Sequence, residues 1–427
     1  MSKIVWGGMG VAVLAGAAAA GNLYADKSLR EHYQQNLNPA PNISVQYTDY
    51  HMATLTGTAK WKMTIISDPC NAKEKLVFHG QDQIQRTWKG YQIDSKMNLE
   101  QGQGQFSEFF QQPLNVSTQV NWLGVSTTKL SIPAIEKKEA GLEAKFSPMQ
   151  IEFQAKQSQG HQKIVNMSFD VPQLTVRDQF GHLQVKGMQL KTNQSLYAQS
   201  LEPGYFQFSI AEMQRQDSKA VGSGKMKDFS WRMDTQLHER TVDIQSKFKI
   251  AELGLDNVPA MQDLQFNWDV KDLQRTKMQT FFDIIQKQSN SCLEAENFEQ
   301  EVQQALLAVI NEGFQFESKK NQLKLGTGSI RADWVGKVMP GHQTTVEGLI
   351  KMFPSLLEMQ TDVSFNKQVV KTIMNNYMNA AGKSMSDQEL EQMLSAMQSN
   401  QQIQRDGDEF KLSMHYQYGE KKFLTGQ

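Results

Sequence analysis

The tripeptide Gly382-Lys383-Ser384 has the composition that ends a phosphate-binding loop, where backbone amides and a lysine hold phosphate oxygens. The glycine that such a loop requires five residues earlier is Tyr377, and the preceding residues have helical spacing rather than the alternation of a strand. We therefore interpret the tripeptide as a connection between two helices.

Metal binding has weak support. The eight histidines include no H-x-H pair and no H-E-x-x-H motif, which would supply ligands on one face of a strand or helix. Asp406 and Asp408 have the spacing that opens a calcium loop, but Phe410 occupies the next ligand position and the loop glycine is missing. We interpret this segment as a turn before a strand, and we assign no metal ligand.

Paired carboxylates could form a catalytic site. An acidic cluster consists of Glu294, Glu296, Glu299 and Glu301. Two such groups could act as general acid and base, but these lie in and before the first turns of a predicted helix, where carboxylates stabilise the helix dipole. The chain also has no Gly-x-Ser-x-Gly nucleophile motif. We assign no catalytic residue and no cofactor site, and we expect a protein that is not an enzyme.

The two cysteines, Cys70 and Cys292, are not arranged as a C-x-x-C motif, which disfavours zinc ribbons and thioredoxin-like chemistry. In an oxidising compartment they could form a disulfide. The formal net charge is −1 over 427 residues, so no overall electrostatic attraction to nucleic acid is expected.

The amino-terminal segment carries the strongest targeting signal. No charged side chain occurs between Lys3 and Asp26, and these 22 residues would extend about 33 Å as a helix, enough to cross a hydrocarbon core of about 30 Å. The alternative is a cleaved signal peptide, since Ala18-Ala19-Ala20-Gly21 resembles a small-residue cleavage site. Either reading places the body outside the cytosol, and we expect a single-pass protein of the bacterial inner membrane with its body in the periplasm.

Small residues recur every fourth position in this segment, at Gly8, Ala12, Gly16 and Ala20. Such spacing permits close approach of two membrane helices, so a homodimer is one expectation. The alternative is coincidence in a Gly/Ala-rich segment.

Beyond the anchor (residues 1–25) we expect a stalk and linker (26–41), an antiparallel β-rich body (42–270) and an α+β region (271–427) closed by a β-hairpin. Leu29, Tyr33 and Leu37 have the four-residue spacing of a helical stalk. Strict alternation over 53–65 then predicts a thirteen-residue strand in a long, coiled sheet. Alternation also predicts strands around 114–122, 149–155, 165–171, 264–270 and 410–418. The overall expectation is a β-dominated α+β fold.

Apolar residues at helical spacing indicate four helices after residue 271, around residues 278–285, 298–309, 369–377 and 386–397. Ser386 and Glu389 form a possible capping box for the last of them.

The two ends of the body carry a resemblance. The segments Val45–His51, Leu412–Tyr418 and Phe423–Gln427, together with the apolar start, resemble the YdgA-like family of bacterial inner-membrane-anchored proteins, which has no established activity. The resemblance implies location and topology and not mechanism. An anchor followed by a long amphipathic sheet is also similar in architecture to the AsmA-like proteins, which are associated with moving lipid between bacterial membranes.

The function expected from these features is non-catalytic. The apolar face of the long strand, including Leu55, Trp61, Met63 and Ile65, could form a groove for lipid acyl chains or could pack against the C-terminal helices as a closed core. The alternative is an envelope scaffold that binds a partner protein through polar strands or exposed edges.

Overall fold

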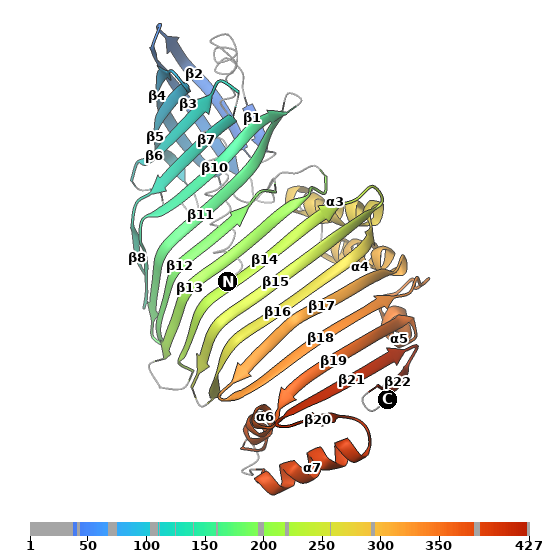
Figure 1. The fold of residues 1–427 in the computed structure, drawn as a ribbon. Coiled ribbons are helices and arrows are strands. Elements are labelled where there is room, and N and C mark those ends of the chain that lie inside the picture. The colour runs from blue at the N-terminus through green and yellow to red at the C-terminus, as the bar shows by residue number, and fades with distance from the viewer. Residues whose placement is uncertain are drawn as a thin grey trace. The chain divides into compact units, whose positions relative to one another are not determined.

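The computed structural model describes residues 37–40, 43–66, 75–102, 110, 112–123, 125–139, 141–158, 161–194, 200–217, 222–256, 258–291, 295–379 and 385–424. Two compact units are formed, the first within Met1–Val176, Gly187–Gln199 and Ile285–Glu294, and the second within Arg177–Lys186, Ser200–Ile284 and Ala295–Gln427. Both are built on antiparallel strands, as Figure 1 shows, and the prediction of a β-dominated fold with a long antiparallel sheet is confirmed.

The first unit is an antiparallel meander. Its strands are β1 (Leu37–Ala40), β2 (Ile43–Met52), β3 (Thr56–Ile66), β4 (Lys75–Thr87), β5 (Gly90–Gly102), β6 (Leu114–Asn121), β7 (Val125–Ile132), β8 (Ile135–Glu139), β9 (Leu142–Phe146), β10 (Met149–Ser158) and β11 (His161–Asp178). Each strand from β1 to β7 pairs with the next, and β10 then pairs with both β7 and β11. Strands β8 and β9 form a hairpin, and β9 also pairs with β11.

Alternation of apolar and polar residues gives this unit its core. On β3 the side chains of Trp61, Met63 and Ile65 are buried while the lysines and threonines between them are more exposed. They belong to a buried cluster that draws on strands β2 to β7, β10 and β11. The inner face of the meander is therefore filled by its own side chains.

Two boundaries in this unit differ from the sequence prediction. The strand expected over 53–65 begins at Thr56, because the Ala53 N–H donates to the Thr56 carbonyl and closes a turn after β2. Leu37, expected at the end of a helical stalk, is instead the first residue of β1 and lies opposite Val45. The following Asn38-Pro39 explains this, since a residue before proline is biased away from helical geometry.

The second unit contains longer strands. Most of its sheet consists of β13 (Gly204–Asp217), β14 (Gly224–Leu237), β15 (Thr241–Leu255), β16 (Val258–Gln274), β17 (Phe314–Leu325), β18 (Gly328–Val338), β19 (Leu357–Asn366), β20 (Gln404–Asp406), β21 (Glu409–Gln417) and β22 (Glu420–Phe423). The antiparallel order is β13-β14-β15-β16-β17-β18-β19-β21, and both β20 and β22 pair with β21. A further strand, β12 (Gly181–Thr192), belongs partly to each unit.

Helices connect strands at both ends of this second sheet (Figure 1). The described helices are α3 (Arg275–Ser291), α4 (Ala295–Asn311), α5 (Val346–Leu356), α6 (Lys367–Asn379) and α7 (Asp387–Ser399). Four of them match the predicted helices, and the capping box of α7 is present with bonds in both directions between Ser386 and Glu389. The sequence analysis missed α5, whose first turn is capped by the Thr345 side chain and which contains Pro354.

The described helices begin at Arg275, next to the change of pattern expected near residue 271. The predicted anchor at residues 1–25 and most of the stalk at 26–41 lie outside the described residues. Across the described part of the chain, no helix is both long enough and apolar enough to cross a membrane.

Candidate apolar binding face

One face of the second unit's sheet is lined by aromatic side chains. Phe208, Trp231, Phe248 and Phe266 lie directly opposite one another on the four consecutive strands β13 to β16. Cross-strand partners point to the same side of a sheet, so the four rings form one continuous row. We call this side of the sheet the apolar face; its other members include Phe206, Phe229, Met233, Trp268, Phe316, Trp334, Met359, Val363, Leu412 and Met414.

The rings of the apolar face contact one another laterally. Phe229 lies 5.8 Å from Phe208 and 5.4 Å from Phe248 between ring centroids, and both pairs are edge-to-face. Phe266 and Trp334 approach to 5.7 Å across the intervening strand β17. Edge-to-face packing is favourable without an opposing layer. Contacts between neighbouring rings on the same face therefore keep them in an ordered arrangement.

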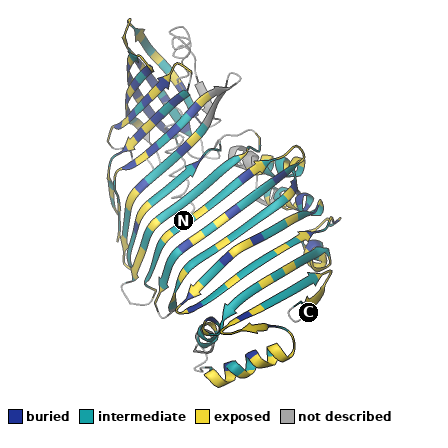
Figure 2. Ribbon diagram, viewed as in Figure 1, coloured by how far each residue is buried: buried dark blue, intermediate teal, exposed yellow. Residues whose placement is uncertain are grey.

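The middle of the apolar face is only half-buried. Trp231 is 36% exposed and Phe266 is 39% exposed, and neither belongs to a buried cluster of the described residues. Figure 2 shows the central strands of this sheet mostly in the intermediate class. A sheet face covered by a second layer would contain fully buried rings, as the first unit does.

Helices cover the apolar face at the two ends of its strands. At one end, Met278 and Phe281 of α3 and Val309 of α4 pack with strand residues such as Val242 and Val270. At the other end, residues of α6 and α7 pack against strand residues in a second cluster, which includes Val370, Leu390, Leu394, Phe365 and Phe410. The aromatic row lies in neither cluster, so it is open among the described residues, while the helices cover the apolar face near the ends of the strands.

A polar network lies between Phe266 and Trp334. Lys320 has φ of 62° at a β-bulge, which turns Ser318 and Asn321 to the same side of β17. Asn321 Nδ2 donates to the Ala332 carbonyl at 2.7 Å, Asn321 Oδ1 accepts the Asn267 N–H at 2.7 Å, and Ser318 Oγ donates to the Asn267 carbonyl. These buried groups are therefore satisfied internally and do not demand a polar ligand.

The opposite side of the sheet is charged. Glu317 accepts bonds from Lys319 at 2.6 Å and Lys271 at 2.9 Å, and Lys337 contacts Glu358 at 2.9 Å. Hydrogen bonds from Lys319 and then Lys271 lower the pKa of Glu317 below its ordinary value. The sheet thus has one face suited to water and one suited to hydrocarbon.

The edge at β21 is already occupied. Residues Gln404–Asp406 of β20 pair with one half of β21, and Glu420–Phe423 of β22 pair with the other half. The Leu424 N–H donates to the Ser413 carbonyl beyond β22. Short strands that cover an edge in this way prevent the pairing of another chain.

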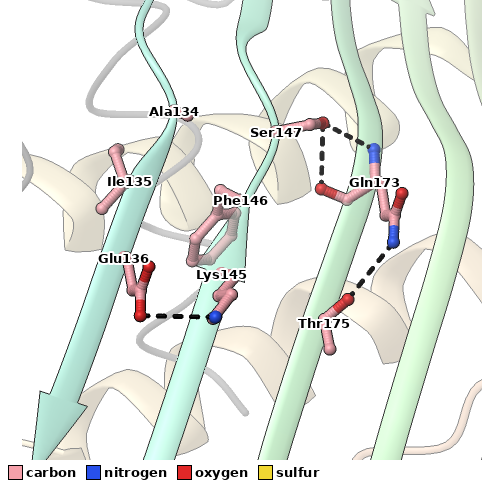
Figure 3. Close-up of a pocket in the computed structure, with 8 residues that line it drawn as sticks. All are labelled: Ala134, Ile135, Glu136, Lys145, Phe146, Ser147, Gln173 and Thr175. Carbon is pink, nitrogen blue, oxygen red and sulfur yellow. Dashed lines mark hydrogen bonds and ion pairs between the residues drawn. The ribbon is translucent and has the colours of Figure 1, made fainter.

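An open hollow of about 410 Å³ lies among described residues of the first unit. Figure 3 shows its lining residues, Ala134, Ile135, Glu136, Lys145, Phe146, Ser147, Gln173 and Thr175. Lys145 pairs with Glu136 at 3.4 Å, and Ser147 Oγ both donates to the Gln173 carbonyl and accepts the Gln173 N–H. The hydrogen bonds from Lys138 and then Lys145 lower the pKa of Glu136. Because these polar groups bind one another, we assign no ligand to the hollow.

The four residues predicted for an apolar groove do not share one surface. Trp61, Met63 and Ile65 are enclosed in the core of the first unit, with Met63 at 0% exposed. Leu55 is 62% exposed at the turn between β2 and β3. The extended open apolar surface is instead on the second unit, where alternation in the sequence predicts strands only around residues 264–270 and 410–418. Phe206, Phe208, Phe229 and Trp231 alternate in the same way and were missed.

The other predicted positions lie outside the described residues. These are Gly8, Ala12, Gly16 and Ala20, for helix association, and Cys70 and Cys292, for the disulfide. Both ideas stay predictions. Within the ranges that the structure describes, no group of three or more His, Cys, Asp or Glu side chains is placed to hold a metal ion. Asp406 and Asp408 flank Gly407 in the turn between β20 and β21, as the sequence predicted, and Asp406 pairs with Lys411 at 3.3 Å.

The fold and the apolar face define a class of β-rich protein with a two-sided antiparallel sheet, whose apolar surface is covered near the strand ends by the helices that the structure describes. The chain belongs to a family described as "Bacterial protein of unknown function (DUF945)", whose model matches residues 1–423. No curated protein and no solved structure matches the chain.

Proposed function

We propose that this chain is a non-catalytic envelope protein, anchored in the bacterial inner membrane with its body in the periplasm, whose apolar face binds lipid acyl chains. The location is supported by the uncharged segment between Lys3 and Asp26, by membership of a bacterial family, and by the resemblance of the chain ends to YdgA-like proteins. The apolar face supports the proposal that the protein binds lipid.

The observation that carries the proposal is the half-buried row of Phe208, Trp231, Phe248 and Phe266. Removing hydrocarbon from water contributes about 0.8 kcal/mol for each buried methylene, and this gain needs no specific polar partner. The one polar atom of the row is already satisfied, since Trp231 Nε1 donates to Ser246 Oγ at 2.9 Å. An acyl chain can therefore cover the row without leaving a hydrogen-bond donor unpaired.

The dimensions of the face suit such a ligand. The apolar face crosses eight strands, β13 to β19 and β21. At about 4.8 Å between strands this is about 34 Å, which exceeds the roughly 15 Å that an acyl chain spans in one leaflet of a bilayer. One or more chains fit along the apolar face.

The test is native mass spectrometry of the detergent-extracted full chain with identification of bound lipid, on the wild type and two variants. Phe266→Glu places a charge on the apolar face, and Val335→Glu places the same charge on the opposite face of the same sheet at a similar exposure, 45% against 39%. We expect the wild type and Val335→Glu to carry lipid and Phe266→Glu to lose most of it. A wild type without lipid, or equal lipid on both variants, contradicts the proposal.

The alternative is an envelope scaffold that binds another protein through the charged face. Its support is the dense set of ion pairs around Glu317 and Glu358, which presents an ordered pattern of charge. Strand addition at β21 is disfavoured because β20 and β22 cover that edge. A co-purifying protein in place of lipid in the same spectra would favour the scaffold.

A further inference from the structure

Three hairpin turns lie at one end of the first unit. They join β2 to β3, β4 to β5 and β6 to β7, and alternate turns of an antiparallel meander fall at the same end. The Arg86 N–H donates to the Leu55 carbonyl at 2.8 Å, and Trp122 Nε1 donates to the Trp88 carbonyl at 2.8 Å. These bonds join the three turns into one surface, which we call the tip and define by Leu55, Arg86, Trp88, Lys89, Trp122 and Leu123.

The tip exposes large apolar side chains. Trp88 is 83% exposed, Leu123 is 74% exposed, Leu55 is 62% exposed and Trp122 is 44% exposed. Single exposed apolar residues are ordinary on protein surfaces, but four on three hydrogen-bonded turns form a patch. Such a patch indicates a binding surface, and its composition tells which partner fits.

Cations are the charged groups among these apolar residues. Lys89 Nζ lies 4.7 Å from the centre of the Trp88 ring, and Arg86 Cζ lies 5.9 Å from that of Trp122. Arg86 and Lys89 are the charged residues of the tip itself, and the nearby His51 pairs with Asp49 at 3.0 Å. The tip is thus apolar and basic, which is complementary to a surface with hydrocarbon beneath a layer of negative charge.

The tip packs on a buried apolar cluster of the first unit. The Trp122 ring meets the Tyr91 ring edge-to-face at 5.4 Å. Tyr91 is itself buried in a cluster with Ala59, Ile84, Ile93 and Val120. A rigid platform presents the exposed tryptophans with little loss of conformational freedom on binding.

We propose that the tip docks on the interfacial region of an anionic phospholipid bilayer. Trp88 and Leu123 enter the boundary between headgroups and acyl chains, where the amphipathic indole ring is favoured. Arg86 and Lys89 lie at the level of the phosphates with their stems along the apolar surface. This surface is separate from the apolar face of the second unit, so the inference goes beyond the proposed function and does not depend on it.

The test reads the environment of Trp88 directly. The full chain, kept in solution with amphipol, is mixed with vesicles of brominated phosphatidylglycerol and phosphatidylcholine in equal parts, since bromine quenches tryptophan on contact. Subtracting the emission of the Trp88→Phe variant from that of the wild type leaves the Trp88 component, whether or not another part of the chain enters the vesicle. We expect this component to shift to shorter wavelength and to lose more than half of its intensity. An unquenched Trp88 component overturns the proposal.

A matched control moves the reporter to another exposed turn. Phe180 is 62% exposed between β11 and β12, and Phe180→Trp is added to the Trp88→Phe background. We expect no quenching of this component, and quenching equal to that of Trp88 would show that contact is not specific to the tip. Lys89→Gln should weaken the response to phosphatidylglycerol, and an unchanged response contradicts the charge argument. Phe266→Glu should leave the quenching of Trp88 unchanged, which separates this result from the test of the apolar face.

Discussion

Trp61 Nε1 donates a hydrogen bond of 2.7 Å to Asp82 Oδ1 inside the core of the first unit, between the neighbouring strands β3 and β4. Asp82 is 2% exposed, and a carboxylate at that depth depends on hydrogen bonds to replace its hydration. Burial, and then the charge of Asp82, raise the pKa of Tyr47 far above its usual 10.0. Gly80 lies opposite Trp61, where a Cβ would lie 2.0 Å from the indole ring, so the glycine leaves room for the tryptophan.

Replacing the donor in this pair should destabilise the fold. Trp61→Phe keeps a ring in the core but removes the N–H, so we expect a loss of about 2–4 kcal/mol in the free energy of unfolding. The measurement is denaturant unfolding of the full chain. Trp231→Phe is the control, because that indole bonds to the neutral Ser246 on a half-buried face and its loss should cost at most about 1.5 kcal/mol. Equal losses in both variants would mean that the buried carboxylate has no special dependence on Trp61.

The sequence predicted where strands occur better than it predicted what covers them. Trp61 with Met63 and Phe266 with Trp268 follow the same alternation, yet the first pair is buried and Phe266 is 39% exposed. A period of two shows that one face of a strand is apolar, but whether a second layer packs on it depends on contacts distant in the chain. The site therefore could not be located from alternation alone.

Local signals decided which turns and helices were predictable. Ser386 and Glu389 specify the start of α7 by a pattern within four residues, and the structure contains the predicted capping box. The turn at residues 53–55 contains none of the usual Gly, Pro, Asn or Asp, so alternation alone predicts a strand that runs through it. Helix α5 contains Pro354, which obscures a short helical pattern of apolar residues such as Leu349.

The capping box should make the stability of α7 depend on pH. Bonds from the backbone and side chain of Ser386 lower the pKa of Glu389 below its ordinary 4.5. A carboxyl with a lowered folded-state pKa stabilises the fold fully above its unfolded pKa, and this stabilisation is lost as pH falls through the folded pKa. Thermal unfolding of wild type and Glu389→Gln should therefore differ most near neutral pH and converge in acid.

The control for this pH dependence is Glu347→Gln, a carboxylate in the first turn of α5 that makes an exposed pair with Lys351. Exposed pairs of this kind contribute little and are screened by salt. We expect a smaller difference from wild type than for Glu389→Gln, and one that salt removes. A Glu389→Gln difference that is constant from neutral to acid pH would contradict the role of the ionised carboxylate.

The same charged substitution should destabilise the fold far more in the first unit than in the second. Met63 is fully buried, so Met63→Glu places a carboxylate among apolar side chains without a partner and should destabilise the fold by several kcal/mol. Phe266→Glu lies on a half-exposed face where the carboxylate reaches water, and we expect a cost below about 1.5 kcal/mol. Thermal and denaturant unfolding of the two full-length variants, with Val335→Glu as the reference for an exposed position, measures the contrast. If Phe266→Glu were as unstable as Met63→Glu, the apolar face would be a covered core, because only burial away from water gives a single carboxylate that cost.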